Sequence, residues 1–114
     1  MTKTLEVSIE TKILIRAREL VEQGWVQHTG YSVEERKPHW WSRTQTIEHF
    51  CAQTAIGKAA MLLGNAPHIA ERILVSAIGC RIIGWNDAFS RTKEDVLAAF
   101  DTAIAQSMDV GRLQ

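Results

Sequence analysis

The sequence is poor in the residues and patterns that mark several specialised classes of protein. Its 114 residues include two cysteines and two prolines, which is too little cysteine for the framework of a disulfide-stabilised secreted domain. No stretch approaches the roughly 20 apolar residues of a membrane-spanning helix. The first residues lack the apolar run of a signal peptide. These absences predict a cytoplasmic protein with no membrane segment.

A net charge of either sign is also lacking. The 13 basic and 13 acidic side chains balance, whereas nucleic-acid-binding domains usually carry a basic excess that neutralises phosphates. A nucleic-acid partner is therefore not expected. The length suits one domain, since domains most often have about 100–150 residues. We expect a single domain over residues 1–114, with frayed ends at 1–7 and 108–114.

Recognisable catalytic and metal-binding motifs are absent as well. There is no phosphate-binding loop, dinucleotide fingerprint, nucleophile elbow or zinc-protease motif. The four histidines lack the paired spacing of zinc ligands. Cys51 and Cys80 fall in apolar helical patterns, where a thiol behaves as a small buried hydrophobe. We predict no metal and no cofactor, and the sequence favours a protein that is not an enzyme.

What is present is a helical spacing of apolar residues. It predicts four helices: about 9–23, about 46–63, a third from Pro67 to Gly84, and a fourth that begins at Thr92. Thr92 and Asp95 stand three apart, as in a capping box, and Ser8 is a predicted N-cap. The third helix is the most apolar, so we expect it to lie centrally. The predicted fold class is mainly α, a compact four-helix domain.

Two of the predicted helices end with the same dipeptide. Gly24-Trp25 follows the first and Gly84-Trp85 the third. A glycine after a helix commonly adopts the left-handed conformation, and the apolar residue that follows packs back on the last turn. We expect Trp25 to contact Leu20 in this way. The pattern predicts that Trp25 and Trp85 belong to the scaffold of the fold.

The segment from Trp25 to Arg43 has no helical pattern and is long for a connection in a compact domain. β-prone residues surround Gly30, so we expect a long loop or a short β-hairpin between the first two helices. Aromatic residues in this segment form the first candidate binding surface: Tyr31, His39, Trp40 and Trp41. Tryptophan and tyrosine are favoured at binding hot spots. The alternative is a lid of tryptophans over the core, because large aromatics are buried on average.

The second candidate site is the polar cluster formed by Asn86, Asp87 and Arg91. These side chains can converge on a small ligand at a helix N-terminus, where free N–H groups favour anions. The alternative is structural. Asn86 then adopts a turn conformation, and Asp87 bonds nearby backbone N–H groups or Arg91. Turn residues of these types are common between helices, so the structural interpretation is favoured.

Several segments together resemble a bacterial and phage family of small domains of unknown function. The resemblance covers residues from about 12 to 105, and its most specific part combines Trp85-Asn86-Asp87 with Arg91-Thr92. Family members often have glycine at the position of Thr54, and the segment between the first two helices varies. The other matching residues are Arg16 to Trp25, Phe50-Cys51-Ala52, Ala55-Ile56, Glu94, Val96, Phe100-Asp101 and Ala103-Ile104. The resemblance implies the fold and no activity.

The leading hypothesis is a non-enzymatic accessory protein, associated with a phage or mobile element, that binds a protein partner. The loop from Tyr31 to Trp41 is the expected partner surface. The alternative is a small-molecule-binding domain, or a minor enzyme, that uses the Trp85-Asn86-Asp87 turn and Arg91. A homodimer with an apolar interface is a third hypothesis.

Overall fold

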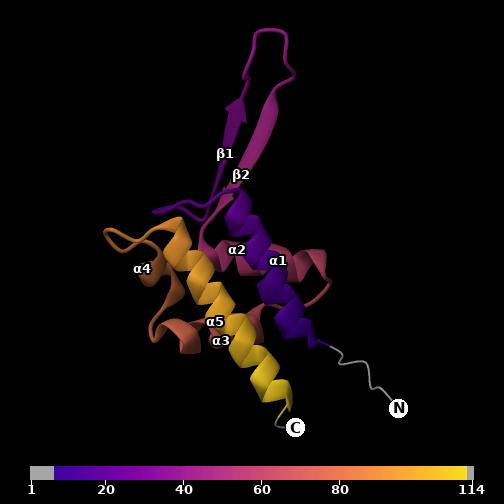
Figure 1. Cartoon of the computed structure of the whole chain (residues 1–114), viewed down its shortest axis with the longest axis vertical. Helices are drawn as coiled ribbons and strands as arrows, with labels where there is room; N and C mark the ends of the chain where they lie inside the picture. Colours follow the sequence, from indigo (N-terminus) through magenta and orange to yellow (C-terminus); the bar gives the residue numbers. More distant parts are fainter. Residues whose placement is uncertain (1–6, 113–114) are drawn as a thin grey trace.

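The computed structural model describes residues 7–112 of the chain. Its elements, in order, are α1 (Ile9–Gln23), β1 (Tyr31–Arg36), β2 (Gln45–Phe50), α2 (Ala52–Leu62), α3 (His68–Ile78), α4 (Ile82–Asn86) and α5 (Lys93–Arg112). The helices gather in one body, and the hairpin formed by β1 and β2 projects from one end of it (Figure 1). The mainly helical class with a hairpin between the first two helices is confirmed, and residues 7–112 form five helices instead of the four expected.

The ends of the chain were predicted to fray. Residues 1–6 and 113–114 lie outside the described part of the structure, while α5 continues to Arg112. Within the described residues, no helix is long and apolar enough to cross a membrane.

The core lies where α1 packs against α2 and α5. Leu14, Ile56 and Phe100 come from these three helices and are fully buried, as their helical spacing predicts. A buried hydroxyl pair, Thr11 Oγ1 to Ser107 Oγ at 2.6 Å, joins α1 to α5. The predicted N-terminal caps of α1 and α5 are confirmed by the bonds from Thr11 N to Ser8 Oγ and from Asp95 N to Thr92 Oγ1.

The predicted second helix is wrong over its first five residues. Residues 45–50 form β2, which pairs antiparallel with β1 from Tyr31↔Phe50 to Arg36↔Gln45. The spacing of Ile47 and Phe50 suits a helix, but Thr46 and Ile47 are also β-prone, and pairing with β1 decides between the two. The helix begins only after Cys51, whose Sγ caps it by accepting from Thr54 N.

The predicted third helix is also wrong in extent and position. It ends at Ile78, because Gly79 adopts the left-handed conformation (φ 77°) and its N–H bonds Val75 O. The next helix, α4, contains Gly84 and Trp85, so this dipeptide does not end a helix. Only Ala70 and Leu74 of α3 are buried, so α3 is peripheral. Cys80, predicted to be buried, is exposed between α3 and α4.

Gly24 ends α1 by a different device from the one predicted. Its backbone is extended (φ −169°), so it does not reverse the chain in a left-handed turn. Its carbonyl accepts from Phe50 N at 2.9 Å. A Cβ atom at this position would collide with the carbonyl oxygen of Glu48 in β2. The glycine is required because the end of α1 and the base of the hairpin approach each other closely.

We predict opposite effects of two glycine substitutions, Gly24→Ala and Gly57→Ala. The first forces backbone apart at the base of the hairpin and should lower the free energy of unfolding by about 1–3 kcal/mol. The second adds a methyl group where nothing lies within 4 Å and should raise it by about 0.5–1 kcal/mol, because alanine favours the helix. Urea unfolding measures both. Wild-type stability of Gly24→Ala would contradict the close approach.

Candidate functional site

The side chain of Asn86 joins three segments of the chain. It is fully buried at the end of α4. Its Oδ1 accepts from Trp25 Nε1 at 2.7 Å and from the backbone N–H of Ala52, the first residue of α2, at 3.1 Å. Its Nδ2 donates to Val26 O at 3.1 Å and to Asp87 Oδ1 at 2.9 Å. We call this set of bonds the Asn86 clasp. Every polar atom of the amide has a partner, so none faces a ligand.

Asp87 extends the clasp to the segment that follows α1. Its Oδ1 also accepts from the backbone N–H of His28 at 2.8 Å. His28 has φ 67°, which is uncommon for a residue other than glycine. The bond from His28, and then the one from Asn86, stabilise the charged carboxylate and lower the pKa of Asp87. Gln27 adds bonds from Nε2 to Asn86 O and Ala88 O, both at 3.0 Å.

Arg91 is directed to Trp85 rather than to Asn86 or Asp87. Its Nε donates to Trp85 O at 2.9 Å, and its guanidinium carbon lies 4.2 Å from the centre of the indole ring. The three residues predicted as a cluster therefore lie around the end of α4, and their side chains form hydrogen bonds with other residues of the fold. A role of Asn86, Asp87 and Arg91 in ligand binding stays a prediction.

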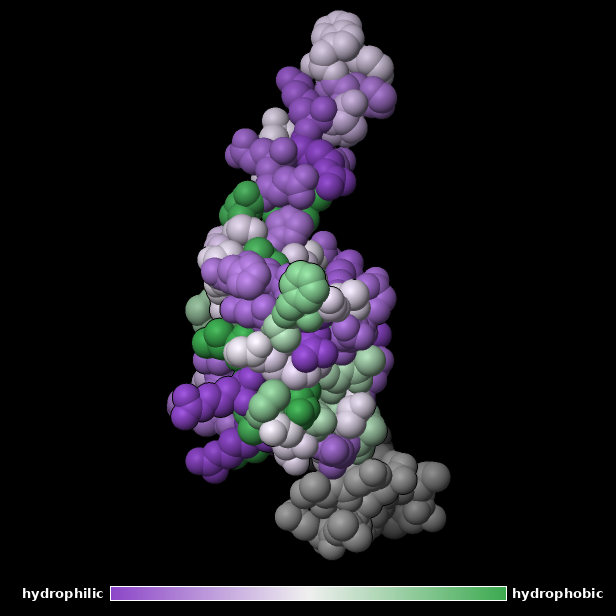
Figure 2. Space-filling model, turned by 90° about the vertical axis from the view of Figure 1, so that its left-hand side faces the viewer, coloured by the Kyte–Doolittle hydropathy of each residue, from purple (hydrophilic) through white to green (hydrophobic). Residues whose placement is uncertain are grey.

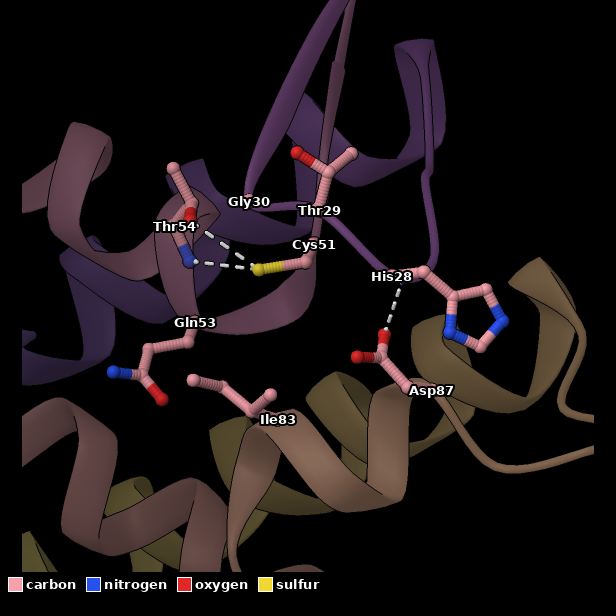
Figure 3. Close-up of a pocket in the computed structure, with 8 residues that line it drawn as sticks. All are labelled: His28, Thr29, Gly30, Cys51, Gln53, Thr54, Ile83 and Asp87. Carbon is pink, nitrogen blue, oxygen red and sulfur yellow. Dashed lines mark hydrogen bonds between the residues drawn. The ribbon is translucent and has the colours of Figure 1, made fainter.

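The cysteine at the start of α2 borders a small hollow of about 180 Å³ (Figure 3). Cys51 Sγ lies 3.2 Å from Thr54 Oγ1 and turns toward that residue, while the ring of His28 points away from it. A thiol paired with a histidine base is therefore not formed here. Among the side chains that the structure describes, no three histidine, cysteine or acidic residues are grouped as metal ligands.

The tryptophans of the hairpin lie at the tip, which we define as residues 37–44. Trp40 is 84% exposed and Trp41 is 67% exposed, so the alternative prediction of a lid over the core is wrong. The rings of His39 and Trp41 stack with centres 4.5 Å apart, and Trp40 meets Trp41 edge-on at 5.7 Å. Three of the four aromatic residues predicted as a partner surface are thus brought together.

The fourth residue, Tyr31, lies at the opposite end of the hairpin. It pairs with Phe50 in the register of the sheet, and the two rings meet at 5.2 Å. Its hydroxyl donates to Glu48 Oε2 at 3.1 Å. Six strand residues span about 17–20 Å, so Tyr31 does not share a surface with the tip.

One exposed aromatic residue was not predicted from any sequence pattern. Phe89 is 99% exposed between α4 and α5.

Fold and surfaces together define a small, mainly helical domain with a projecting hairpin and an aromatic tip. The chain belongs to DUF6197, a family of unknown function, whose sequence profile matches residues 9–106. The predicted resemblance to a family of small domains of unknown function is thereby confirmed. No curated protein and no solved structure matches the chain.

We predict that Asn86→Ala destabilises the protein strongly. The substitution leaves Trp25 Nε1, the backbone N–H of Ala52 and the carbonyl of Val26 without their partner. Buried groups without partners cost about 1–3 kcal/mol each, so the free energy of unfolding should fall by at least about 3 kcal/mol. Asn65→Ala is the control, since the exposed Asn65 side chain bonds only Leu63 O. Equal losses of unfolding free energy in the two variants would contradict a stabilising role of the clasp.

We predict that acid removes the stabilising contribution of Asp87. Its pKa is lowered in the folded protein, so the charged form stabilises the fold above the unfolded pKa of about 4, and this contribution is lost as the pH falls through the lower folded pKa. Asp87→Asn should therefore be less stable than wild type near neutral pH and approach it below about pH 4. Urea unfolding across this range measures the difference. A difference independent of pH would contradict the assignment.

Proposed function

We propose that this chain is a non-enzymatic interaction protein that binds a partner protein through the tip of its hairpin. The observation that carries the proposal is the exposure of two adjacent tryptophans, Trp40 at 84% and Trp41 at 67%, on a hairpin that stands clear of the helices (Figure 1). Folded proteins bury most of the surface of large aromatics. Exposed apolar clusters mark interaction sites, and tryptophan is among the residues most enriched at hot spots.

The geometry of the tip favours binding with little loss of conformational freedom. Stacking of His39 on Trp41, at an interplanar angle of 6°, and the edge contact of Trp40 hold the rings in one arrangement. Ser42 N donates to His39 O at 2.9 Å and closes the turn beneath them. Side chains that are already ordered lose less entropy on association.

The charge around the tip indicates the chemistry of the partner. Residues 36–45 contain Arg36, Lys37 and Arg43 and no carboxylate. Arg36 is engaged by Glu34 at 3.1 Å, which leaves Lys37 and Arg43 to meet charges on a partner. An apolar pocket with an acidic rim complements this surface. A second copy of the chain is a poorer complement at the same place, because two tips would bring like charges together.

Small-molecule binding at the turn of Asn86 and Asp87 has less support. The Asn86 amide is buried and fully bonded, and Arg91 is occupied by Trp85.

The variant Trp40→Ala/Trp41→Ala tests the proposal. Both rings are exposed, so circular dichroism and thermal unfolding should match those of wild type. Hot-spot residues contribute about 2 kcal/mol or more each, so partner capture should fall by at least about 30-fold. The measurement is quantitative mass spectrometry of proteins retained by immobilised wild-type and variant protein.

Phe89→Ala is the matched control, because it removes an aromatic ring that lies outside the tip and is more exposed than either tryptophan. It should leave capture of the same protein unchanged. Oligonucleotides and anionic vesicles are tested with the same three proteins. Equal capture by all three, or binding to nucleic acid or lipid that requires the tryptophans, would overturn a protein partner.

A further inference from the structure

A groove on the helical body, remote from the tip, has the dimensions of a small-molecule site. It lies between α3 and α4, is bordered by Gln53 of α2, and has a volume of about 670 Å³. Ligand pockets typically have volumes of about 300–1,000 Å³. The break at Gly79 and the extended residue Arg81 (ψ 140°) separate the two helices that form its walls.

Apolar side chains form part of the groove wall. Val75 of α3 and Ile82 and Ile83 of α4 all line it. Val75 and Ile83 are exposed although both are aliphatic, Ile83 by 54%. Figure 2 faces α4 and shows apolar surface next to strongly hydrophilic side chains on this side of the helical body. Binding in the groove would therefore remove the apolar part of a ligand from water.

Two arginines on the groove have no charged partner among the side chains that the structure describes. Arg72 of α3 and Arg81 before α4 both line it, and no carboxylate among the side chains described in residues 7–108 lies within ion-pair distance of either. Arg16, Arg18 and Arg36 are each paired with a carboxylate. Glu71 is the single carboxylate among the described residues that line the groove, so two guanidinium groups leave a positive balance that complements an anion.

We propose that this groove binds a small amphiphilic anion. Its apolar body lies against the exposed side chains of Val75 and Ile83, and its carboxylate, sulfonate or phosphate is bound by Arg72 and Arg81. The amide of Gln53 is available to a polar group on the ligand. The site uses none of the residues of the Asn86 clasp and no residue of the tip, so it is independent of the proposed protein binding.

Two fluorescent probes with similar ring systems test the proposal. Anilinonaphthalene sulfonate carries an anionic group, and phenylnaphthylamine is its uncharged counterpart. Both are titrated into the full chain carrying Trp40→Ala/Trp41→Ala, because the exposed tip could otherwise take up either dye. We expect one equivalent of the sulfonate to bind. Addition of Arg72→Gln/Arg81→Gln should weaken sulfonate binding at least about 10-fold, because the anionic group loses both of its guanidinium partners.

Matched variants separate the two halves of the site. In the same background, Arg72→Gln/Arg81→Gln should leave the affinity for phenylnaphthylamine nearly unchanged, whereas Ile83→Ser should weaken both probes. Lys12→Gln/Arg16→Gln removes the same charge from α1 and should change neither. Because Ile83 is exposed, Ile83→Ser should fold, and circular dichroism checks the folding of each variant. Sulfonate binding that is absent, that survives loss of both groove arginines, or that falls equally with the α1 pair would overturn the proposal.

Discussion

The buried amide of Asn86 is the interaction on which the arrangement of the elements depends. Its oxygen accepts from the indole of Trp25, just after α1, and from the first N–H of α2. Its nitrogen donates to the strand-like segment at Val26. Helix N-termini have N–H groups without partners inside the helix, and here one of them is satisfied by a side chain from another helix. A buried amide is favourable only when all its bonds are formed, so these segments must all be in place together.

The clasp explains which parts of the fold the sequence could predict. Helices α1 and α5 follow from local information. Each has its own apolar spacing and a capping side chain directly before it, Ser8 for α1 and Thr92 for α5. The partners of Asn86 are 34 and 61 residues away, and no local pattern contains them. The same applies to β2: the residues around Ile47 suit helix or strand, and pairing with β1 decides. Gly24-Trp25 and Gly84-Trp85 are the same dipeptide, yet Gly24-Trp25 follows a helix and Gly84-Trp85 lies within one.

The candidate sites differ in how far the sequence predicts them, because some depend on local residues and others on how distant segments pack. The aromatic content of residues 39–41 is visible in the sequence, and their exposure follows once the hairpin carries them away from the core. Tyr31 lies nearby in sequence, but strand geometry places it at the hairpin's base. The groove could not be foreseen, since it depends on a helix break at Gly79 within an apolar run that favours one continuous helix. Arg72 and Arg81 become neighbours of one hollow only after that break.

Phe50 connects the hairpin to the helices and thereby fixes the direction of the tip. It is buried, its N–H donates to Gly24 O, and its carbonyl accepts from Val26 N at 3.3 Å. Val26 is also bonded by the amide of Asn86, which belongs to α4, and α4 forms one wall of the groove. The tip and the groove are therefore attached to the same bonded segment although they share no residue. A two-stranded hairpin alone is marginally stable in water. This anchorage at its base, rather than the strand pairing, is what allows two tryptophans to be presented far from the core.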